Sequence, residues 1–149
     1  MGDGASVFTQ ILLGSIGLGL SSAIHIVVLL GAIGLLRKIH YHIDHSVFLK
    51  PGLLMAAALT AVIFGHTVQV WLWAGAFLLA GALPTVADAI YFSLVTYTTV
   101  GYGDVTVGAG TRIFAAMAAV TGLLNFGLST AFLVRLVARL WPNEVSDRE

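Results

Sequence analysis

The residue types best suited to chemistry lie in one short stretch, TYTTVGYGDV, at positions 96–105. It contains three threonines, the carboxylate of Asp104 and two glycines, Gly101 and Gly103. Glycine readily adopts backbone conformations with positive φ, so successive peptide groups can turn their carbonyl oxygens to one side. If several copies of this stretch surround an axis, those oxygens could replace the water shell of a cation.

Composition places this stretch in a membrane protein. The chain has 149 residues, of which 58% are hydrophobic and 9% charged, whereas a soluble globular domain carries about 25% charged residues. The formal net charge is zero, so we expect no nucleic-acid partner. The chain has no cysteine, which excludes disulfides, thiolate chemistry and cysteine metal sites.

Three apolar segments are long enough to span a bilayer. They lie at about 9–36, 51–83 and 113–134, and each exceeds the ~20 residues that a helix needs to cross the hydrocarbon. The first segment is too long for a signal peptide and has no basic residue before it. We therefore predict an all-α membrane protein with three transmembrane helices.

The segment at 84–110 follows a different pattern. Thr85, with Asp88 three residues later, is typical of a helix start, and a helix can then continue to about Tyr97. Twelve residues reach ~18 Å, about half a bilayer. The following TTVGYGD cannot continue a helix, and irregular backbone at membrane depth is tolerated only inside protein or along a wet cavity. This pattern predicts a re-entrant loop, and the partially negative end of its helix favours a cation.

The basic residues predict the orientation of the chain. Of seven Lys and Arg residues, only Arg112 lies between the second and third spans. Basic loops stay in the cytoplasm, so we expect a multi-pass protein of the plasma membrane with its N-terminus outside and its C-terminus cytoplasmic. The other six basic residues are Arg37, Lys38, Lys50, Arg135, Arg139 and Arg148.

The stretch TTVGYGD resembles the signature of tetrameric potassium channels, and the resemblance extends over about 51–140. It implies a homotetramer around a central pore, in a lipid bilayer, with K⁺ ions as the permeant species. The implied division is an extra N-terminal helix and loop at 1–50, a pore domain at 51–141 and a short cytoplasmic tail at 142–149. The pore domain consists of an outer helix at 51–83, a pore helix at 85–97, a filter at 99–103 and an inner helix at 111–141.

By this resemblance, carbonyl oxygens and one threonine hydroxyl form the K⁺ sites of the selectivity filter. The filter residues are Thr99, Val100, Gly101, Tyr102 and Gly103.

Four further residues are assigned by resemblance to the support of the filter. Asp104 would lie at the outer mouth, and Tyr91, thirteen positions earlier, could donate a hydrogen bond to it. Phe92 would complete an aromatic cuff around Tyr102, and Thr98 directly precedes the filter.

The third span, with its GLLNFG stretch, resembles an inner helix that carries gate and cavity residues. Gly122 occupies the usual hinge position, but close helix packing explains a glycine there equally well. Leu123, Phe126 and Thr130 would face the cavity or the lower gate. Asn125 would reach the cavity or bind a neighbouring helix.

The N-terminal span is an addition to the two-helix pore. It is rich in glycine and serine, which let helices approach closely, so we expect it to pack peripherally against the second span of its own or a neighbouring subunit. It lacks the ladder of basic residues that a voltage sensor needs. We also expect His25 to hydrogen-bond His66 or Gln69 and so to fix how this helix docks.

The loop sequence HYHIDH contains His40, His42 and His45. A polar interfacial loop is the favoured interpretation, and a proton sensor is the second. A Zn²⁺ or Ni²⁺ site is the third, and we assign no transition metal.

The sequence thus predicts a potassium-selective channel that conducts K⁺ passively through a carbonyl-lined filter, with no enzyme activity. Two alternatives stay open: a nonconducting regulatory or partner-dependent channel subunit, and a K⁺ uptake transporter subunit. The sequence identifies no regulatory partner.

Overall fold

The structure, a computed structural model, describes residues 6–42 and 49–141. It contains helices α1 (Val7–His42), α2 (Leu49–Leu79), α3 (Val86–Tyr97) and α4 (Arg112–Leu140), with the short 3-10 turn η1 (Ala109–Thr111) before α4. The described residues contain no strand, so the predicted all-α class is confirmed. The predicted tail at 142–149 lies outside the described residues.

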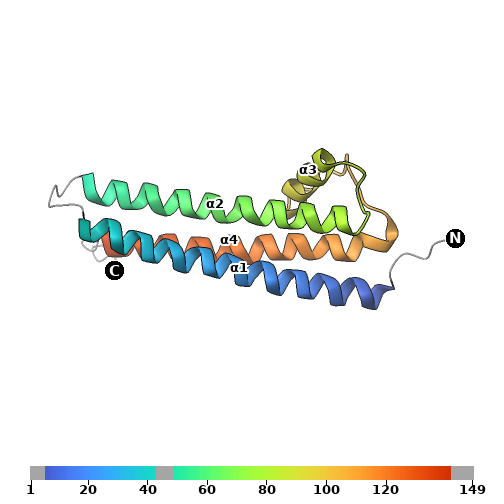
Figure 1. The fold of residues 1–149 in the computed structure, drawn as a ribbon, viewed down its shortest axis with the longest axis horizontal. Helices are drawn as coiled ribbons and strands as arrows, with labels where there is room; N and C mark the ends of the chain where they lie inside the picture. Colours follow the sequence, from blue (N-terminus) through green and yellow to red (C-terminus); the bar gives the residue numbers. More distant parts are fainter. Residues whose placement is uncertain (1–5, 43–48, 142–149) are drawn as a thin grey trace, which may run out of the picture.

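The three long helices lie side by side, while α3 is a short helix set against one end of them (Figure 1). Each of α1, α2 and α4 is long and apolar enough to cross a membrane. The chain passes from end to end three times, so α1 and α4 run in the same direction and α2 in the opposite one. Helices of 29 to 36 residues reach ~44–54 Å, which carries both ends beyond the hydrocarbon.

The second span ends earlier than predicted, at Leu79 rather than at 83. Gly81 has φ +62°, a conformation that favours glycine. Its N–H donates to the carbonyl of Leu78, and the N–H of Ala82 donates to that of Phe77. This pair of bonds is a Schellman cap, which satisfies the last carbonyls and turns the chain away from the helix axis.

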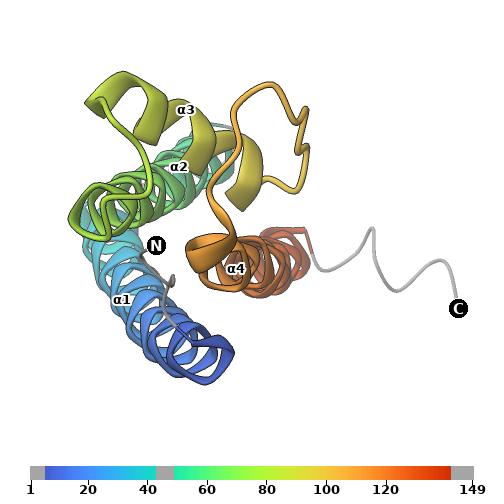
Figure 2. The same cartoon turned by 90° about the vertical axis from the view of Figure 1, so that its right-hand side faces the viewer.

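The N-terminal helix packs differently from the prediction. It was expected against the second span, but α1 contacts both α2 and α4, and the view along the bundle shows it beside both (Figure 2). Close approach explains the contact with α4, because a Cβ on Gly14 would lie 2.5 Å from the Cγ of Met117. The small residues of α1 therefore serve two neighbouring helices.

An aromatic core fixes α3 on the long helices. Phe77 of α2 contacts Phe92 of α3 edge to face, with ring centroids 5.1 Å apart, and contacts Phe114 of α4 at 5.7 Å. The hydroxyl of Ser93 donates to the carbonyl of Val70 at 2.7 Å, which ties α3 to α2 by a buried hydrogen bond. The position of α3 is thus determined by packing within one chain.

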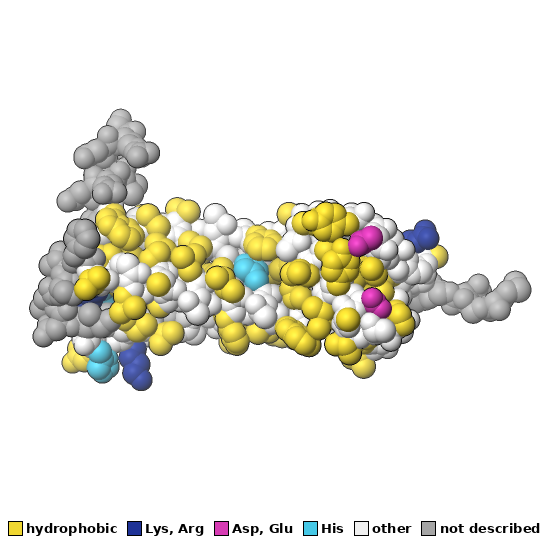
Figure 3. All heavy atoms as spheres, turned by 90° about the horizontal axis from the view of Figure 1, so that it is seen from above, with side chains coloured by type: hydrophobic (Ala, Val, Ile, Leu, Met, Phe, Trp, Pro, Cys, Tyr) yellow, Lys and Arg dark blue, Asp and Glu magenta, His cyan; other side chains and the backbone are white. Residues whose placement is uncertain are grey.

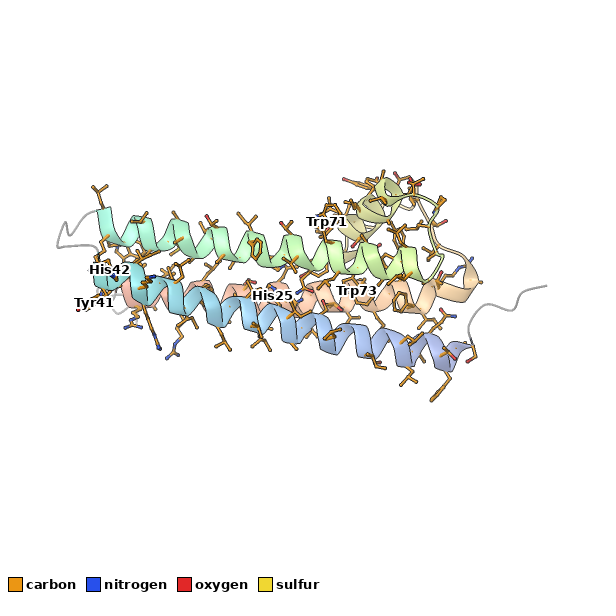
Figure 4. All side chains as sticks on the ribbon, viewed as in Figure 1. His25, Tyr41, His42, Trp71 and Trp73 are labelled. Atoms are coloured by element: carbon orange, nitrogen blue, oxygen red, sulfur yellow. The ribbon has the colours of Figure 1, made fainter. Side chains whose placement is uncertain are left out.

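Buried polar side chains join the helices at mid-length. The hydroxyl of Ser129 lies 2.9 Å from Nε2 of His25 and 3.2 Å from Nε2 of His66. The imidazoles of His25 and His66 contact each other through their rings, at 4.9 Å between centroids. Figure 4 shows His25 directed into the space between the long helices.

The expected hydrogen bond from His25 to His66 or Gln69 is therefore wrong. Ser129 of α4 is the shared partner of both imidazoles, because it lies between them. Gln69 is occupied by Ser21, whose hydroxyl donates to the Gln69 amide oxygen, while the Gln69 amide donates to the Ser21 carbonyl at 3.0 Å.

Replacing Ser129 by alanine removes both imidazole contacts at once. We expect Ser129→Ala to lower the free energy of unfolding by about 1–2 kcal/mol, since two buried ring nitrogens lose their partner. The matched control is Ser15→Ala on an exposed position of α1, which should change stability by less than about 0.5 kcal/mol. Unfolding in mixed micelles of rising denaturing detergent measures both, and equal losses would contradict the role given to Ser129.

Candidate functional site

The short helix α3 has a capped start. The hydroxyl of Thr85 accepts from the backbone N–H of Asp88 at 3.1 Å and donates to its carboxylate at 2.7 Å. The predicted helix at 85–97 is observed as Val86–Tyr97, with Thr85 as its N-cap. Thr98 ends the helix, where its N–H and its hydroxyl both donate to the carbonyl of Leu94.

The backbone that follows α3 alternates in handedness. Thr99, Gly101 and Gly103 have φ of +62°, +55° and +80°, while Val100 and Tyr102 between them are not in the positive-φ region. This alternation lets successive carbonyls point to one side of the loop. The N–H of Gly101 donates to the carbonyl of Val95 at 3.1 Å, which fastens the loop to the end of α3.

Thr99 was predicted for its hydroxyl and carbonyl, but its backbone conformation was missed. Among the described residues it is the only non-glycine with positive φ, a conformation that costs about 1–2 kcal/mol for a residue with a side chain. The available signal for a positive φ at Thr99 was its position two residues before Gly101, because Gly101 and Gly103 are separated by the same interval.

The loop at 99–103 is exposed in the single chain. Val100 and Tyr102 keep 52% and 73% of their surface, although both are large and apolar or aromatic. Irregular backbone with this exposure is stable in a membrane only if protein or water covers it. In a bilayer this surface must therefore face either more protein or a water-filled space.

Tyr91 and Asp104 meet as the resemblance implied. The Tyr91 hydroxyl donates to the Asp104 carboxylate at 2.6 Å across thirteen residues of chain. This hydrogen bond lowers the pKa of Asp104, against a smaller opposing effect of desolvation. The same hydrogen bond, together with the negative charge of Asp104, raises the pKa of Tyr91.

Tyr97, the last residue of α3, is the point where α3 meets the other helices. Its hydroxyl lies 2.9 Å from Nδ1 of His66 and accepts from the Asn125 amide at 3.3 Å. Tyr97 is fully buried, and sequence reasoning assigned it no role. The available signal was the presence of polar residues, His66 and Asn125, within the second and third spans, because they can pair with a buried hydroxyl.

Gly122 of α4 lies directly against Tyr97. A Cβ on Gly122 would overlap the carbonyl oxygen of Tyr97 and would lie 2.8 Å from its carbonyl carbon. Of the two interpretations left open, this geometry favours close packing of the inner helix on the end of α3. Asn125, also fully buried, reaches Tyr97 within its own chain and not an open cavity.

The other residues of α4 that were predicted to line the gate or cavity differ in their surroundings. Leu123 keeps 62% of its surface and Thr130 is also exposed, whereas Phe126 stacks on His66 with ring centroids 4.3 Å apart. Phe92 is 8% exposed, and its described ring contact is with Phe77 of α2. The expected aromatic cuff around Tyr102 stays a prediction.

The histidine loop is described only in part. His40 and His42 are exposed at the end of α1, and Nδ1 of His42 lies 2.9 Å from the carbonyl of Lys38. His45 lies outside the described residues. Within residues 6–42 and 49–141, no three histidine, aspartate or glutamate side chains gather as a metal site would require.

Charged side chains separate to the two ends of the bundle. Asp88, Asp104 and Arg112 lie at the end that carries α3, whereas the other described basic residues lie at the opposite end (Figure 3). Those residues are Arg37, Lys38, Lys50, Arg135 and Arg139, and Arg148 falls outside the described residues.

Comparison with known proteins decides the family. The profile of a family described as "Ion channel" matches residues 53–139, more than half of the chain, from α2 through the loop to α4. The chain belongs to the ion channel family. This channel is accordingly a multi-pass membrane protein, in agreement with its three apolar helices.

Curated relatives of the channel are known in mammals. It is 31% identical over 67 residues to "Potassium voltage-gated channel subfamily A member 6" of Homo sapiens and to the proteins of that name in Mus musculus and Rattus norvegicus. The match covers 44% of the channel and only 13% of each relative. No solved structure is significantly similar to it.

Gly122 offers a direct test of how the inner helix meets α3. We expect Gly122→Ala to destabilise the channel by about 1–3 kcal/mol, because the added methyl group overlaps the Tyr97 carbonyl. Gly127→Ala is the matched control on the same helix, since its Cβ would meet nothing within 4 Å. Thermal unfolding in detergent compares them. A hinge without close packing would instead make Gly122→Ala stabilising, by the helix propensity of alanine.

Tyr91→Phe tests the bond to Asp104. Because the folded pKa of Asp104 is lowered, this bond stabilises the channel above the ordinary pKa of about 3.9, and the contribution is lost as pH falls through the lowered value. We expect Tyr91→Phe to raise the pKa of Asp104 toward its ordinary range. Carboxyl NMR titration measures this shift, with Tyr41→Phe at the opposite end as control. An unchanged Asp104 titration would contradict the assignment.

Proposed function

We propose that this protein is a potassium-selective channel, built as a homotetramer, that conducts K⁺ passively across the plasma membrane. The observation that carries the proposal is the alternating backbone of Thr99, Gly101 and Gly103 at the end of a half-length helix. The names of the mammalian relatives, which are potassium channels, support the choice of ion.

Four loops around an axis would meet the need of the exposed stretch for further covering. Each subunit presents the same surface, so rotation of one copy onto the next closes a ring. In that ring the carbonyl oxygens of residues 99–102 and the Thr99 hydroxyl replace the hydration shell of K⁺. Ions then move between closely spaced sites, each strong enough to admit an ion and weak enough to release it.

Two features of the chain add to the preference for a cation. The C-terminal end of α3 carries about half a negative charge, and it ends at Thr98, next to the first filter residue. Asp104 follows the filter with its pKa lowered by Tyr91, so it carries a negative charge at neutral pH. The outer mouth thus attracts cations, while selection among them rests on the carbonyl sites.

Reconstituted protein tests the proposal. Purified protein in liposomes is expected to pass K⁺ and to exclude Na⁺ when either gradient is imposed. We expect Gly101→Ala to abolish this flux, because alanine at φ +55° costs about 1–2 kcal/mol in each of four subunits. Gly108→Ala is the matched control, since Gly108 has φ −65° and open space at its Cβ position.

The possible outcomes separate the alternatives. Equal K⁺ and Na⁺ flux would refute selectivity. Intact tetramers without flux would favour a nonconducting or partner-dependent subunit. An assembly with fewer than four subunits that moves K⁺ against its gradient would favour the uptake transporter.

A further inference from the structure

The basic end of the bundle, opposite the end that carries the loop at 99–103, contains a pocket. It has a volume of about 680 Å³ and lies between the last turns of α1 and α4 and the first turns of α2. Leu36 of α1 and Leu54 of α2, which are 8% and 3% exposed, give it an apolar floor.

One face of α1 lines the pocket. Its residues recur at intervals of three and four, which places them on a single face of a helix. They change along α1 from apolar to basic and aromatic: Ile33, Leu36, Arg37, His40 and Tyr41. Tyr41 lies at the extreme end of the bundle (Figure 4).

One face of α4 lines the opposite side with alternating apolar and basic residues. Phe132 and Leu136 are apolar, while Arg135 and Arg139 are basic, again at intervals of three and four. The first lining residue of each helix is apolar, Ile33 on α1 and Phe132 on α4, whereas the last is Tyr41 on α1 and Arg139 on α4. Because α1 and α4 run in the same direction, the inner end of the pocket is more apolar than its outer end.

The charge of the pocket is unbalanced within the described part of the chain. Three guanidinium groups line it, whereas the two described carboxylates, Asp88 and Asp104, lie at the other end of the bundle (Figure 3). The C-terminal dipoles of α1 and α4 oppose an anion, but each equals only about half a charge. Three full positive charges outweigh them, so the pocket favours an anion.

We propose that this pocket binds an anionic glycerophospholipid from the surrounding leaflet. Its phosphate would bind Arg37, Arg135 and Arg139, since guanidinium matches phosphate with two parallel hydrogen bonds. An acyl chain would lie deeper, against Ile33 and Phe132. An amphiphile suits both parts of the pocket, whereas a free phosphate would leave the apolar part empty and a neutral lipid would leave the arginines unpaired.

The depth of the pocket agrees with a lipid ligand. Tyr41 and Trp141 mark the ends of α1 and α4, and aromatic residues concentrate at the level of lipid headgroups. The site needs the N-terminal helix, because Arg37 and the α1 face are part of it. Binding would join that helix to the inner helix, and it does not depend on which ion the channel conducts.

Lipid titration of the purified protein in a neutral detergent tests the proposal. Phosphatidylglycerol and phosphatidylcholine with identical acyl chains serve as probes, and native mass spectrometry counts the bound lipid. We expect phosphatidylglycerol to bind at least about tenfold more tightly. Arg37→Gln and the double variant Arg135→Gln with Arg139→Gln should each remove about tenfold of that affinity.

Two charge controls separate the pocket from a general basic surface. Lys38→Gln removes one positive charge at the same end without touching the lining, and Arg112→Gln removes one at the opposite end. Both should leave the preference largely intact. Ile33→Trp fills the apolar part and keeps all three arginines, so it should weaken phosphatidylglycerol binding while the purified protein stays folded.

Three results would overturn the proposal. The first is equal binding of the two lipids, as expected if carboxylates at 44, 144, 147 and 149, outside the described residues, already neutralise the arginines. The second is an equal loss of affinity in Lys38→Gln and Arg37→Gln, which would indicate diffuse surface charge. The third is full displacement of the lipid by inorganic phosphate, which would make the site one for a soluble anion.

Discussion

A backbone that leaves the helix at membrane depth must find other partners for its peptide groups, because hydrocarbon offers none. In this channel the constraint falls on the end of α3, where the helix stops at Tyr97 and the alternating loop begins. Gly122 admits the Tyr97 carbonyl against α4, and the Gly101 N–H returns to α3 through the Val95 carbonyl. The position of the loop therefore depends on the position of this helix end.

The hydrogen bonds behind Tyr97 can all run in one direction. The Asn125 amide donates to the Tyr97 hydroxyl, which donates to Nδ1 of His66. Nε2 of a neutral His66 then carries the proton and donates to Ser129, whose hydroxyl donates to Nε2 of His25. Each hydroxyl accepts once and donates once toward the next group, while the two ends of the series, Nδ1 of His25 and Oδ1 of Asn125, have no hydrogen-bond partner among the described residues. A buried polar series of this kind specifies one arrangement of helices more strictly than apolar packing does.

Sequence reasoning went furthest where the physical cause was local. The cap at Thr85 and the end of α3 near Tyr97 depend on short stretches of sequence. The meeting of Tyr91 with Asp104 was expected from the resemblance to potassium channels and not from local chemistry. It failed where a side chain chooses among partners on different helices. His25 had two expected partners and took a third, Ser129, because the relative rotation of α1 and α4 decides which hydroxyl lies opposite. The spacing of apolar residues along α4 likewise did not predict which of its residues pack against the other helices.

The N-terminal helix is joined to α4 at two levels, and this has a mechanical consequence. His25 meets Ser129 at mid-membrane, and Arg37 and Arg135 share the pocket twelve residues farther along α1 and six farther along α4. A helix is stiff over such lengths, so a ligand that draws the basic ends together must also bias the contact at Ser129. From Ser129 the hydrogen bonds continue through His66 to Tyr97, the residue that places the loop. Ligand binding at the basic end would then be coupled to the end that carries α3 by a shift between two rotational positions of α1 relative to α4. The loop itself would not need to change.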